Sequence, residues 1–388
     1  MDNTQKAKLA LDAKWYFEGP PSGRMVLRNI VDQLLVQKND YELYLFVQSK
    51  HRKEAVNVWG DMPYVHLIFV PKLITLLSNV LLLHFYALYY KVDVVLFQNY
   101  TTFLPGSYKK LVYIHDILFV EYPEYYSLKE YIYFKPMIWL AKWADAIITI
   151  SDTERGRLIR HNIFDRKNIF VVHHGISENF KELSSYNAHD ILHIYAKYTL
   201  PDKFILYVGR LNVRKNILNL VNSVHLMQDK SVKLIIAGGK RTDDKRVNAL
   251  ITRNGLDDRV IFLGFVPDND LYKLYACSYI FCFPSFAEGF GLPPLEAMKC
   301  GVPVIVSNRT SLPEVCGTAA LYIDPDDSQG LADSIDKLLA NELFYAMMKA
   351  KAIEHSAAFT WKNAVDQLLT IMLAYGPGKT NSLHQAGS

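Results

Sequence analysis

One stretch of the chain, residues 283–303, constrains the fold more than any other: FPSFAEGFGLPPLEAMKCGVP. A short apolar strand is predicted at 279–283, and small, turn-forming residues follow it. Proline is favoured in the first turn of a helix, where its missing N–H costs little, so a helix is predicted from Pro293 to Gly301. A strand, a glycine-containing loop and a helix N-terminus form an arrangement that binds phosphate, because free N–H groups point at the anion.

Two acidic residues flank this loop. Glu288 lies within it, and Glu296 lies in the first turn of the predicted helix. A carboxylate repels phosphate but accepts hydrogen bonds from sugar hydroxyls. Taken singly, Glu288 is also explained as a solvated loop acid, and Glu296 as an acid that complements the helix dipole. The joint pattern favours a site for a diphosphate with a sugar at each end, which is a nucleotide sugar.

The segment E-G-F-G-L-P-P-L-E-A-M, which runs from Glu288 to Met298, resembles the signature of the retaining family-four glycosyltransferases. The resemblance covers most of the chain and implies the GT-B fold: α/β, with two Rossmann-like domains facing across a cleft. It implies that Glu288 contacts the transferred sugar and that Glu296 contacts the nucleotide ribose. The remaining donor-binding residues implied in this loop are Gly289, Phe290, Gly291 and Leu292, and amides at the last two hold the diphosphate.

The second half of the chain alternates short apolar strands with helical stretches, which is typical of a parallel, doubly wound sheet. The strands are predicted at 204–208, 233–237, 260–263, 279–283 and 304–307.

A glycine and two cations follow the first of these strands, at Gly209, Arg210 and Lys215. Arginine can bind a diphosphate through two parallel hydrogen bonds from its guanidinium group, and lysine through the point charge of its ammonium group. The alternative is that both residues are solvated, as arginine and lysine usually are. G-R-L…K-N resembles the family's diphosphate clamp, which implies that Arg210 and Lys215 stabilise the leaving group during catalysis. The resemblance also implies nucleobase contacts near Phe265 and Val266, which are equally explained as core residues.

The first half opens with a predicted strand at 8–13, a Gly/Pro-rich loop and a helix at 24–37, the first βα unit of a nucleotide-type fold. The absence of G-x-G-x-x-G argues against a dinucleotide dehydrogenase. The resemblance places this loop near the donor phosphate and assigns Gly23 to donor binding, although a proline pair departs from the glycine-rich family pattern. Arg24 is a secondary candidate for an anion contact, or else a solvated first-turn residue.

A polar pair, His115 and Asp116, ends a short strand predicted at 111–114. Ligands bind at the carboxyl ends of strands in open α/β sheets, although a solvated loop pair is the alternative. Y-I-H-D resembles the family motif that carries an active-site histidine near the transferred sugar. It implies a catalytic role for His115, as an orienting or charge-stabilising group, and a secondary role for Asp116.

Residues 73–90, LITLLSNVLLLHFYALYY, are uncharged and are bracketed by Lys72 and Lys91. A membrane span needs about 20 apolar residues, so this stretch is borderline. Two interpretations stay open: a helix packed across the sheet, or a helix lying partly in the bilayer interface. Residues 122–143 are dense in aromatics and lysines, which suits a headgroup region but is commoner in core helices with snorkelling lysines. Peripheral membrane association is therefore a hypothesis.

The predicted boundaries follow from these segments. They are an N-terminal acceptor-side domain at 1–176, a linker at 177–200, a C-terminal nucleotide-sugar-binding domain at 201–360, a helix crossing back to the first domain at 361–375 and a disordered tail at 376–388.

The overall composition limits partners and location. The net charge is only +4, and no known nucleic-acid-binding motif stands out, so no nucleic-acid partner is expected. The four cysteines lack metal-binding spacing and are interpreted as thiols in a reducing compartment. No secretory signal is visible, which predicts a cytoplasmic protein, with the inner face of the cell membrane as a hypothesis.

These observations predict a retaining hexosyltransferase that uses a nucleotide diphosphate sugar, without a cofactor or an essential metal. No D-x-D-type metal motif stands in the cleft segments. The residues of the 288–298 motif are most similar to those of the family branch that contains bacterial mannosyltransferases. GDP-mannose is therefore favoured over UDP-glucose as the donor. The expected acceptor is a saccharide or a lipid-linked sugar in cell-surface polysaccharide, lipopolysaccharide or glycolipid synthesis. The alternatives are a sugar phosphorylase of similar fold and a non-catalytic nucleotide-sugar-binding partner protein.

Overall fold

The computed structural model describes residues 6–37, 41–165 and 168–377. The chain forms two compact units. The first contains Met1–His174 and Trp361–Ser388, and the second contains Gly175–Thr360. Each unit is an α/β domain with one parallel sheet, which confirms the prediction of two Rossmann-like domains.

The first unit has a seven-stranded sheet in the order β3-β2-β1-β4-β5-β6-β7, and all neighbouring strands are parallel. Most central strand residues are buried, as expected for a parallel sheet covered on both faces. The strands are β1 (Ala7–Asp12), β2 (Tyr41–Gln48), β3 (Val65–Val70), β4 (Val94–Gln98), β5 (Lys109–Ile114), β6 (Ala146–Thr149) and β7 (Ile169–Val171).

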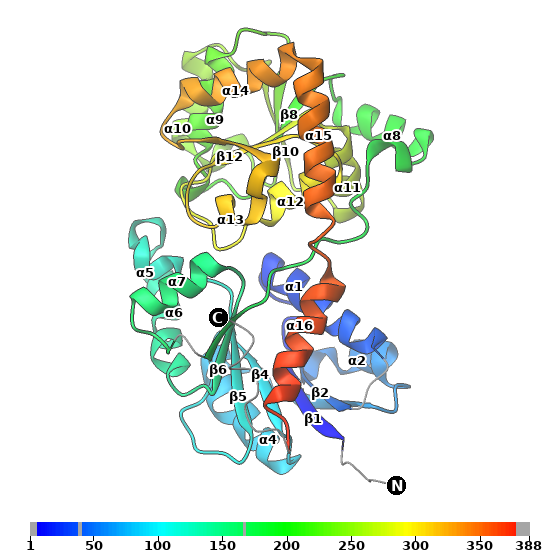
Figure 1. Ribbon diagram of the computed structural model, residues 1–388, viewed down its shortest axis with the longest axis vertical. Helices are drawn as coiled ribbons and strands as arrows, with labels where there is room; N and C mark the ends of the chain where they lie inside the picture. The colour runs from blue at the N-terminus through cyan, green and yellow to red at the C-terminus, as the bar shows by residue number, and fades with distance from the viewer. Residues whose placement is uncertain (1–5, 38–40, 166–167, 378–388) are drawn as a thin grey trace. The chain divides into compact units, whose positions relative to one another are not determined.

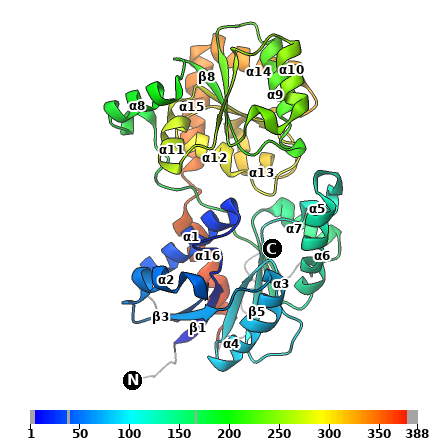
Figure 2. The ribbon, with the colours of Figure 1, turned by 180° about the vertical axis from the view of Figure 1, so that it is seen from behind.

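Helices cover both faces of this sheet. Helices α1 (Pro21–Val36) and α16 (Trp361–Ala374) pack together on the face toward the viewer in Figure 1. The opposite face, seen in Figure 2, carries one apolar core that is shared by α3, the π-helix η2, α4, α5, α6 and α7. These are α3 (Thr75–Leu77), η2 (Ser78–Leu83), α4 (His84–Tyr89), α5 (Leu118–Glu121), α6 (Leu128–Ala141) and α7 (Asp152–Arg160), while α2 (Arg52–Trp59) follows β2.

The second unit has a six-stranded parallel sheet in the order β10-β9-β8-β11-β12-β13 (Figure 1). Its strands are β8 (Phe204–Val208), β9 (Lys233–Ala237), β10 (Val260–Gly264), β11 (Ile280–Phe283), β12 (Val304–Ser307) and β13 (Ala320–Ile323). Its helices are α8 (Ala188–Tyr198), α9 (Ile217–Leu226), α10 (Lys245–Arg253), α11 (Asp268–Cys277), α12 (Leu292–Lys299), α13 (Leu312–Cys316), α14 (Ser328–Ala340) and α15 (Glu342–Ser356).

The predicted linker at 177–200 is wrong in part. These residues belong to the second unit, and α8 forms within them. The Asn187 side chain caps α8 by accepting the His189 N–H at 2.9 Å, which satisfies a backbone donor of the first turn. The sequence analysis also missed β13 and α15. The predicted tail lies, from residue 378 onward, outside the described residues.

The borderline segment at 73–90 forms α3, η2 and α4, whose inner side packs on the first sheet. Among the residues that the structure describes, none of the helices combines the length and apolarity needed to cross a bilayer.

Candidate functional site

The phosphate-binding loop predicted in the second unit links β11 to the N-terminus of α12. Gly291 precedes the helix with φ +120°, and a Cβ added there would lie 2.7 Å from the Leu312 side chain. Both the backbone conformation and the close approach therefore require glycine. No side-chain cap precedes α12. Because Pro293 and Pro294 lack an N–H, the backbone groups that can donate to an anion at this helix end are those of Gly291 and Leu292.

Glu288 lies in this loop and holds two cations. Its Oε1 accepts from Lys215 Nζ at 2.7 Å, and its Oε2 accepts from Arg214 Nη1 at 2.9 Å. Strands β8 and β11 are neighbours, so the residues that follow them meet at one edge of the sheet. Burial by itself would raise the pKa of Glu288, but Arg214 and Lys215 lower it to about 2. The Glu288 side chain is therefore a buried, ionised carboxylate.

Arg214 was missed by the sequence analysis, which assigned Arg210 and Lys215 instead. Arg214 also donates to the carbonyl of Ala287, so it ties the turn after β8 to the loop after β11. Its position next to Lys215 was the available signal. Arg210 follows β8 and is exposed, whereas the Glu288 carboxylate pairs with Arg214 and Lys215.

Two hydroxyls after β12 fix the loop backbone around Glu288. Ser311 Oγ donates to the carbonyls of Glu288 and Phe290 at 3.0 and 2.7 Å. Thr310 Oγ1 accepts the Glu288 N–H at 2.9 Å. The backbone of Gly289 lies between these anchored positions. These hydroxyls position the site residues, a role that the sequence pattern did not reveal.

Glu296 lies on α12, one turn beyond Leu292. Its Oε2 accepts from the Tyr275 hydroxyl at 2.8 Å. Burial raises the pKa of Glu296 to about 7, although the Tyr275 hydrogen bond opposes this shift. A carboxylate with one oxygen held by a tyrosine can offer its other oxygen to a ribose hydroxyl.

The ends of strands β8, β9 and β10 form the rest of this edge. Gly209 donates its N–H to the Ala237 carbonyl at 2.9 Å, and Gly238 donates to the Gly264 carbonyl at 2.7 Å. The two nucleobase candidates differ, because Phe265 is 83% exposed whereas Val266 is only 5% exposed. The Phe265 ring is thus available to a ligand, and Val266 belongs to the core.

The first unit places His115 at the carboxyl end of β5. Its Nε2 lies 3.2 Å from Gln98 Oε1, and the ring centroid of Trp15 lies 6.4 Å away. Burial lowers the pKa of His115 to about 4, so the imidazole is neutral near pH 7. Gln98 and Trp15 were not predicted as site residues.

Gly23 and Arg24 lie in the first turn of α1, which begins at Pro21 rather than at Arg24. Proline at the first helical position favours this earlier start. A Cβ added at Gly23 would lie 3.0 Å from the Trp15 ring. Gly23 therefore packs beside the same tryptophan as His115.

Asp116 and the following turn are held by a buried ion network. Glu154 Oε2 accepts the Ile117 N–H at 3.1 Å, and Arg157 pairs with both Glu154 and Glu121. The Asp116 side chain accepts the Leu118 N–H at 3.2 Å. This network fixes the backbone directly after His115.

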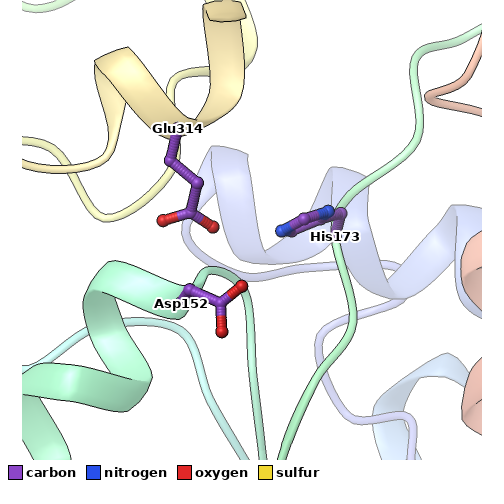
Figure 3. Close-up of side chains that lie close together, drawn as sticks. All are labelled: Asp152, His173 and Glu314. Carbon is purple, nitrogen blue, oxygen red and sulfur yellow. The ribbon is translucent and has the colours of Figure 1, made fainter. Parts of the chain in front are cut away.

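Three residues of types that can bind a metal ion are labelled in Figure 3. Asp152 begins α7 and His173 follows β7 in the first unit, whereas Glu314 lies on α13 in the second unit. Within either unit taken alone, the described residues do not gather three potential ligands, so the geometry assigns no metal centre to a unit.

Comparison with known families covers most of both units. Residues 195–355 match the family described as "Glycosyl transferases group 1", and residues 25–180 match the family described as "Glycosyltransferase Family 4".

Two bacterial relatives show similar sequences. The chain is 34% identical over 280 residues to the serotype-specific mannosyltransferase WbdA of Escherichia coli, a match that covers 69% of this chain but only 34% of WbdA. It is 33% identical over 273 residues to the O-antigen chain mannosyltransferase B of Escherichia coli, covering 69% of this chain and 71% of that protein.

Among solved structures, the sucrose-phosphate synthase tll1590 from Thermosynechococcus elongatus superposes with a TM-score of 0.72 at 20% identity. The superposition covers 94% of this chain and 98% of that one, which shows a common fold. The chain therefore belongs to the group 1, family 4 glycosyltransferases and has their GT-B fold.

Proposed function

We propose that the protein is a retaining glycosyltransferase that moves a hexosyl group from a nucleotide diphosphate sugar to an acceptor hydroxyl. One observation carries this proposal: the ionised Glu288 carboxylate holds Lys215 and Arg214 beside the open N-terminus of α12. Cations, backbone amides and a sugar-binding carboxylate are thus collected at one sheet edge. Glu296, with its Tyr275 hydrogen bond, supplies an acceptor for the ribose.

In the proposed reaction, the bond between the anomeric carbon and the phosphate oxygen breaks while the acceptor oxygen bonds to that carbon on the same face. The acceptor proton passes to an oxygen of the leaving diphosphate. Negative charge grows on the diphosphate, where Lys215, Arg210 and the backbone amides of Gly291 and Leu292 stabilise it. This charge stabilisation requires neither a cofactor nor an essential metal. The neutral His115 orients the sugar by hydrogen bonding, with Asp116 in support.

Mannose is the favoured sugar, with GDP-mannose as the donor, because the relatives WbdA and O-antigen chain mannosyltransferase B are named mannosyltransferases. The acceptor is a saccharide or a lipid-linked sugar of a cell-surface polysaccharide. A lipid-linked acceptor supports a cytoplasmic protein that associates with the inner face of the cell membrane. No nucleic-acid partner is proposed.

Donor binding and hydrolysis across a panel of nucleotide sugars, with EDTA present, test this proposal. Tight binding and slow hydrolysis of one donor, GDP-mannose above others, are expected. Phosphorolysis of a sugar without any nucleotide would instead identify a phosphorylase. Donor binding without transfer, even after membranes are added as an acceptor source, would identify a non-catalytic binding protein.

A further inference from the structure

The first unit exposes an apolar stripe that the transferase chemistry does not use. It lies along the helical segment formed by α3, η2 and α4. Three of its side chains are more than half exposed: Ile74 at 66%, Phe85 at 60% and Tyr89 at 77%. The stripe is defined by Ile74, Leu77, Leu81, Phe85 and Tyr89.

The π-helix keeps these side chains on one side. From Leu77 onward, the stripe residues are four positions apart. In an α-helix this spacing drifts around the axis by about 40° per step, because one turn takes 3.6 residues. The wider turn of η2 (Ser78–Leu83) counteracts this drift, so Leu77, Leu81 and Phe85 stay aligned.

The opposite, buried side of the same segment carries polar side chains that form hydrogen bonds inside the domain. These hydrogen bonds keep the stripe facing outward. Asn79 donates to the carbonyls of Gln98 and Tyr100 at 3.1 and 2.9 Å. His84 Nδ1 lies 2.9 Å from the Tyr108 hydroxyl. The buried side also places Val80, Leu83 and Ala87 in the core, so the segment is apolar on both sides, unlike an ordinary surface helix with one apolar side. Rotating the stripe inward would expose the core and break these hydrogen bonds.

A second apolar patch lies on α6 and the loop that precedes β5. The aromatic cluster is defined by Phe103, Trp139 and Trp143, which are all exposed and whose ring centroids lie 5.5 to 6.5 Å apart. The loop joins this cluster to the stripe segment, since Thr102 Oγ1 donates to the Val80 carbonyl at 2.8 Å.

Lysines outnumber acids in the three segments that carry the patches, although Asp145, just beyond them, pairs with Lys109. Residues 71–91, 99–110 and 125–143 contain a single acidic residue, Glu130, which is engaged in a capping box with Ser127. The same three segments contain seven lysines: Lys72, Lys91, Lys109, Lys110, Lys129, Lys135 and Lys142. Lysines that surround exposed Trp, Tyr and Phe rings form the composition of a headgroup-region surface.

A cavity adjoins the aromatic cluster. It has a volume of about 420 Å³, and Lys109, Lys110, Lys142, Trp143 and Asp145 line part of it. Asp145 pairs with Lys109 at 2.9 Å, and the buried Lys110 donates to the Leu104 carbonyl at 2.7 Å. Among these lining residues, the exposed Lys142 beside the exposed Trp143 suits the phosphate of a lipid headgroup.

We propose that the stripe and the aromatic cluster dock the protein on an anionic lipid bilayer. The apolar side chains enter the headgroup region and the lysines contact lipid phosphates. Charge complementarity favours this partner over a second copy of the chain, which would bring the lysines of both copies together. The inference deepens the proposed membrane association, but its test requires neither a donor nor turnover.

Flotation of the full chain with vesicles tests the inference, using vesicles that contain phosphatidylglycerol and vesicles of phosphatidylcholine alone. The stripe variant is Ile74→Ser/Phe85→Ser/Tyr89→Ser, and the charge variant is Lys129→Gln/Lys135→Gln/Lys142→Gln. The matched control is Leu192→Ser/Leu343→Ser in the second unit, where these side chains are 68% and 86% exposed. Nucleotide-sugar binding and thermal unfolding verify that each variant is folded.

The wild type and the control are expected to float with the anionic vesicles. The stripe and charge variants are expected to bind on the order of tenfold more weakly or worse. A wild type that stays at the bottom with both kinds of vesicle overturns the inference, and so does a folded stripe variant that floats like the wild type. A wild-type dimer that the stripe variant converts to a monomer, without flotation, assigns the surface to a second copy. If flotation fails while donor binding persists, only the docking surface is rejected.

Discussion

The Nζ atom of Lys215 lies 2.7 Å from Oε1 of Glu288, and the two residues are 73 positions apart in the sequence. Lys215 follows β8 and Glu288 follows β11, and the two strands are adjacent and parallel. The pair therefore places a cation beside the diphosphate loop while it keeps the carboxylate ionised. Both partners are expected to contribute to transfer, and they are expected to fail in different ways when replaced.

Glu288→Ala is expected to abolish measurable transfer, a loss of at least about 2–4 kcal/mol in transition-state stabilisation. The substitution removes the sugar-binding carboxylate and leaves Arg214 and Lys215 without their shared partner. Initial rates of transfer from a nucleotide sugar measure the effect. Glu342→Ala, an exposed carboxylate on α15, is the control and should retain full activity. Full activity in the Glu288 variant would refute the assigned role.

Lys215→Ala is expected to weaken donor binding by about 2–4 kcal/mol, because a charge-assisted contact to the diphosphate is lost. Calorimetric titration with the nucleotide sugar measures the change in affinity. Lys245→Ala removes an exposed lysine from α10 of the same unit and should leave the affinity unchanged. Equal affinities in both variants would exclude Lys215 from the diphosphate site.

The raised pKa of Glu296 predicts that both the stability of the protein and its affinity for the donor change with pH near neutrality. Burial raises its pKa from 4.5 to about 7, so in that window the folded protein retains a proton that the unfolded chain has released. Its contribution to stability is therefore complete below pH 4.5 and is lost as the pH rises through about 7. Donor binding uses the ionised carboxylate and should change in the opposite direction, strengthening from about pH 6 to about pH 8.

Calorimetry and thermal unfolding across this pH range check both trends. The variant Glu296→Gln is expected to flatten them while Tyr275 keeps a hydrogen-bond partner. A wild-type donor affinity that stays constant across the range would contradict the prediction.

Arg157→Ala is expected to lower the free energy of unfolding by about 1–3 kcal/mol, because the buried Glu154 carboxyl would lose its Arg157 partner. Arg155→Ala is a matched control two residues away. Arg155 pairs with Asp152 near the surface, and its loss should cost about 1 kcal/mol or less. Urea unfolding of both variants measures the difference, and equal losses would show that the buried network contributes no more than a surface pair.

Much of the fold could be predicted from the sequence. The strands expected at 204–208, 233–237 and 304–307 have the same bounds in the structure, because each is a short apolar run bounded by polar or turn-forming residues. Helix α8 was missed although Ile191, Ile194 and Tyr195 have helical spacing, because the surrounding residues 184–200 were interpreted together as an irregular connection. Strand β13 is no shorter than β12 but lies at the edge of its sheet with two of its four residues not buried, and no strand was predicted there.

The candidate site was predictable where one local motif carries it. The loop and helix start at 288–296 follow from glycine, proline and acid spacing, which are properties of neighbouring residues. Arg214, Ser311 and Thr310 were not predicted, since their contacts with the Glu288 loop depend on which strands are adjacent.

The sequence by itself determined the βα alternation, the anion-binding loop and the presence of an apolar, lysine-flanked segment at 73–90, because these properties depend on local periodicity and residue type. Only the tertiary structure decided that Arg214 joins Lys215 on Glu288, since the order of the strands brings their ends together. It also decided which side of the 73–90 segment faces outward, because hydrogen bonds from Asn79 and His84 hold the polar side against the sheet.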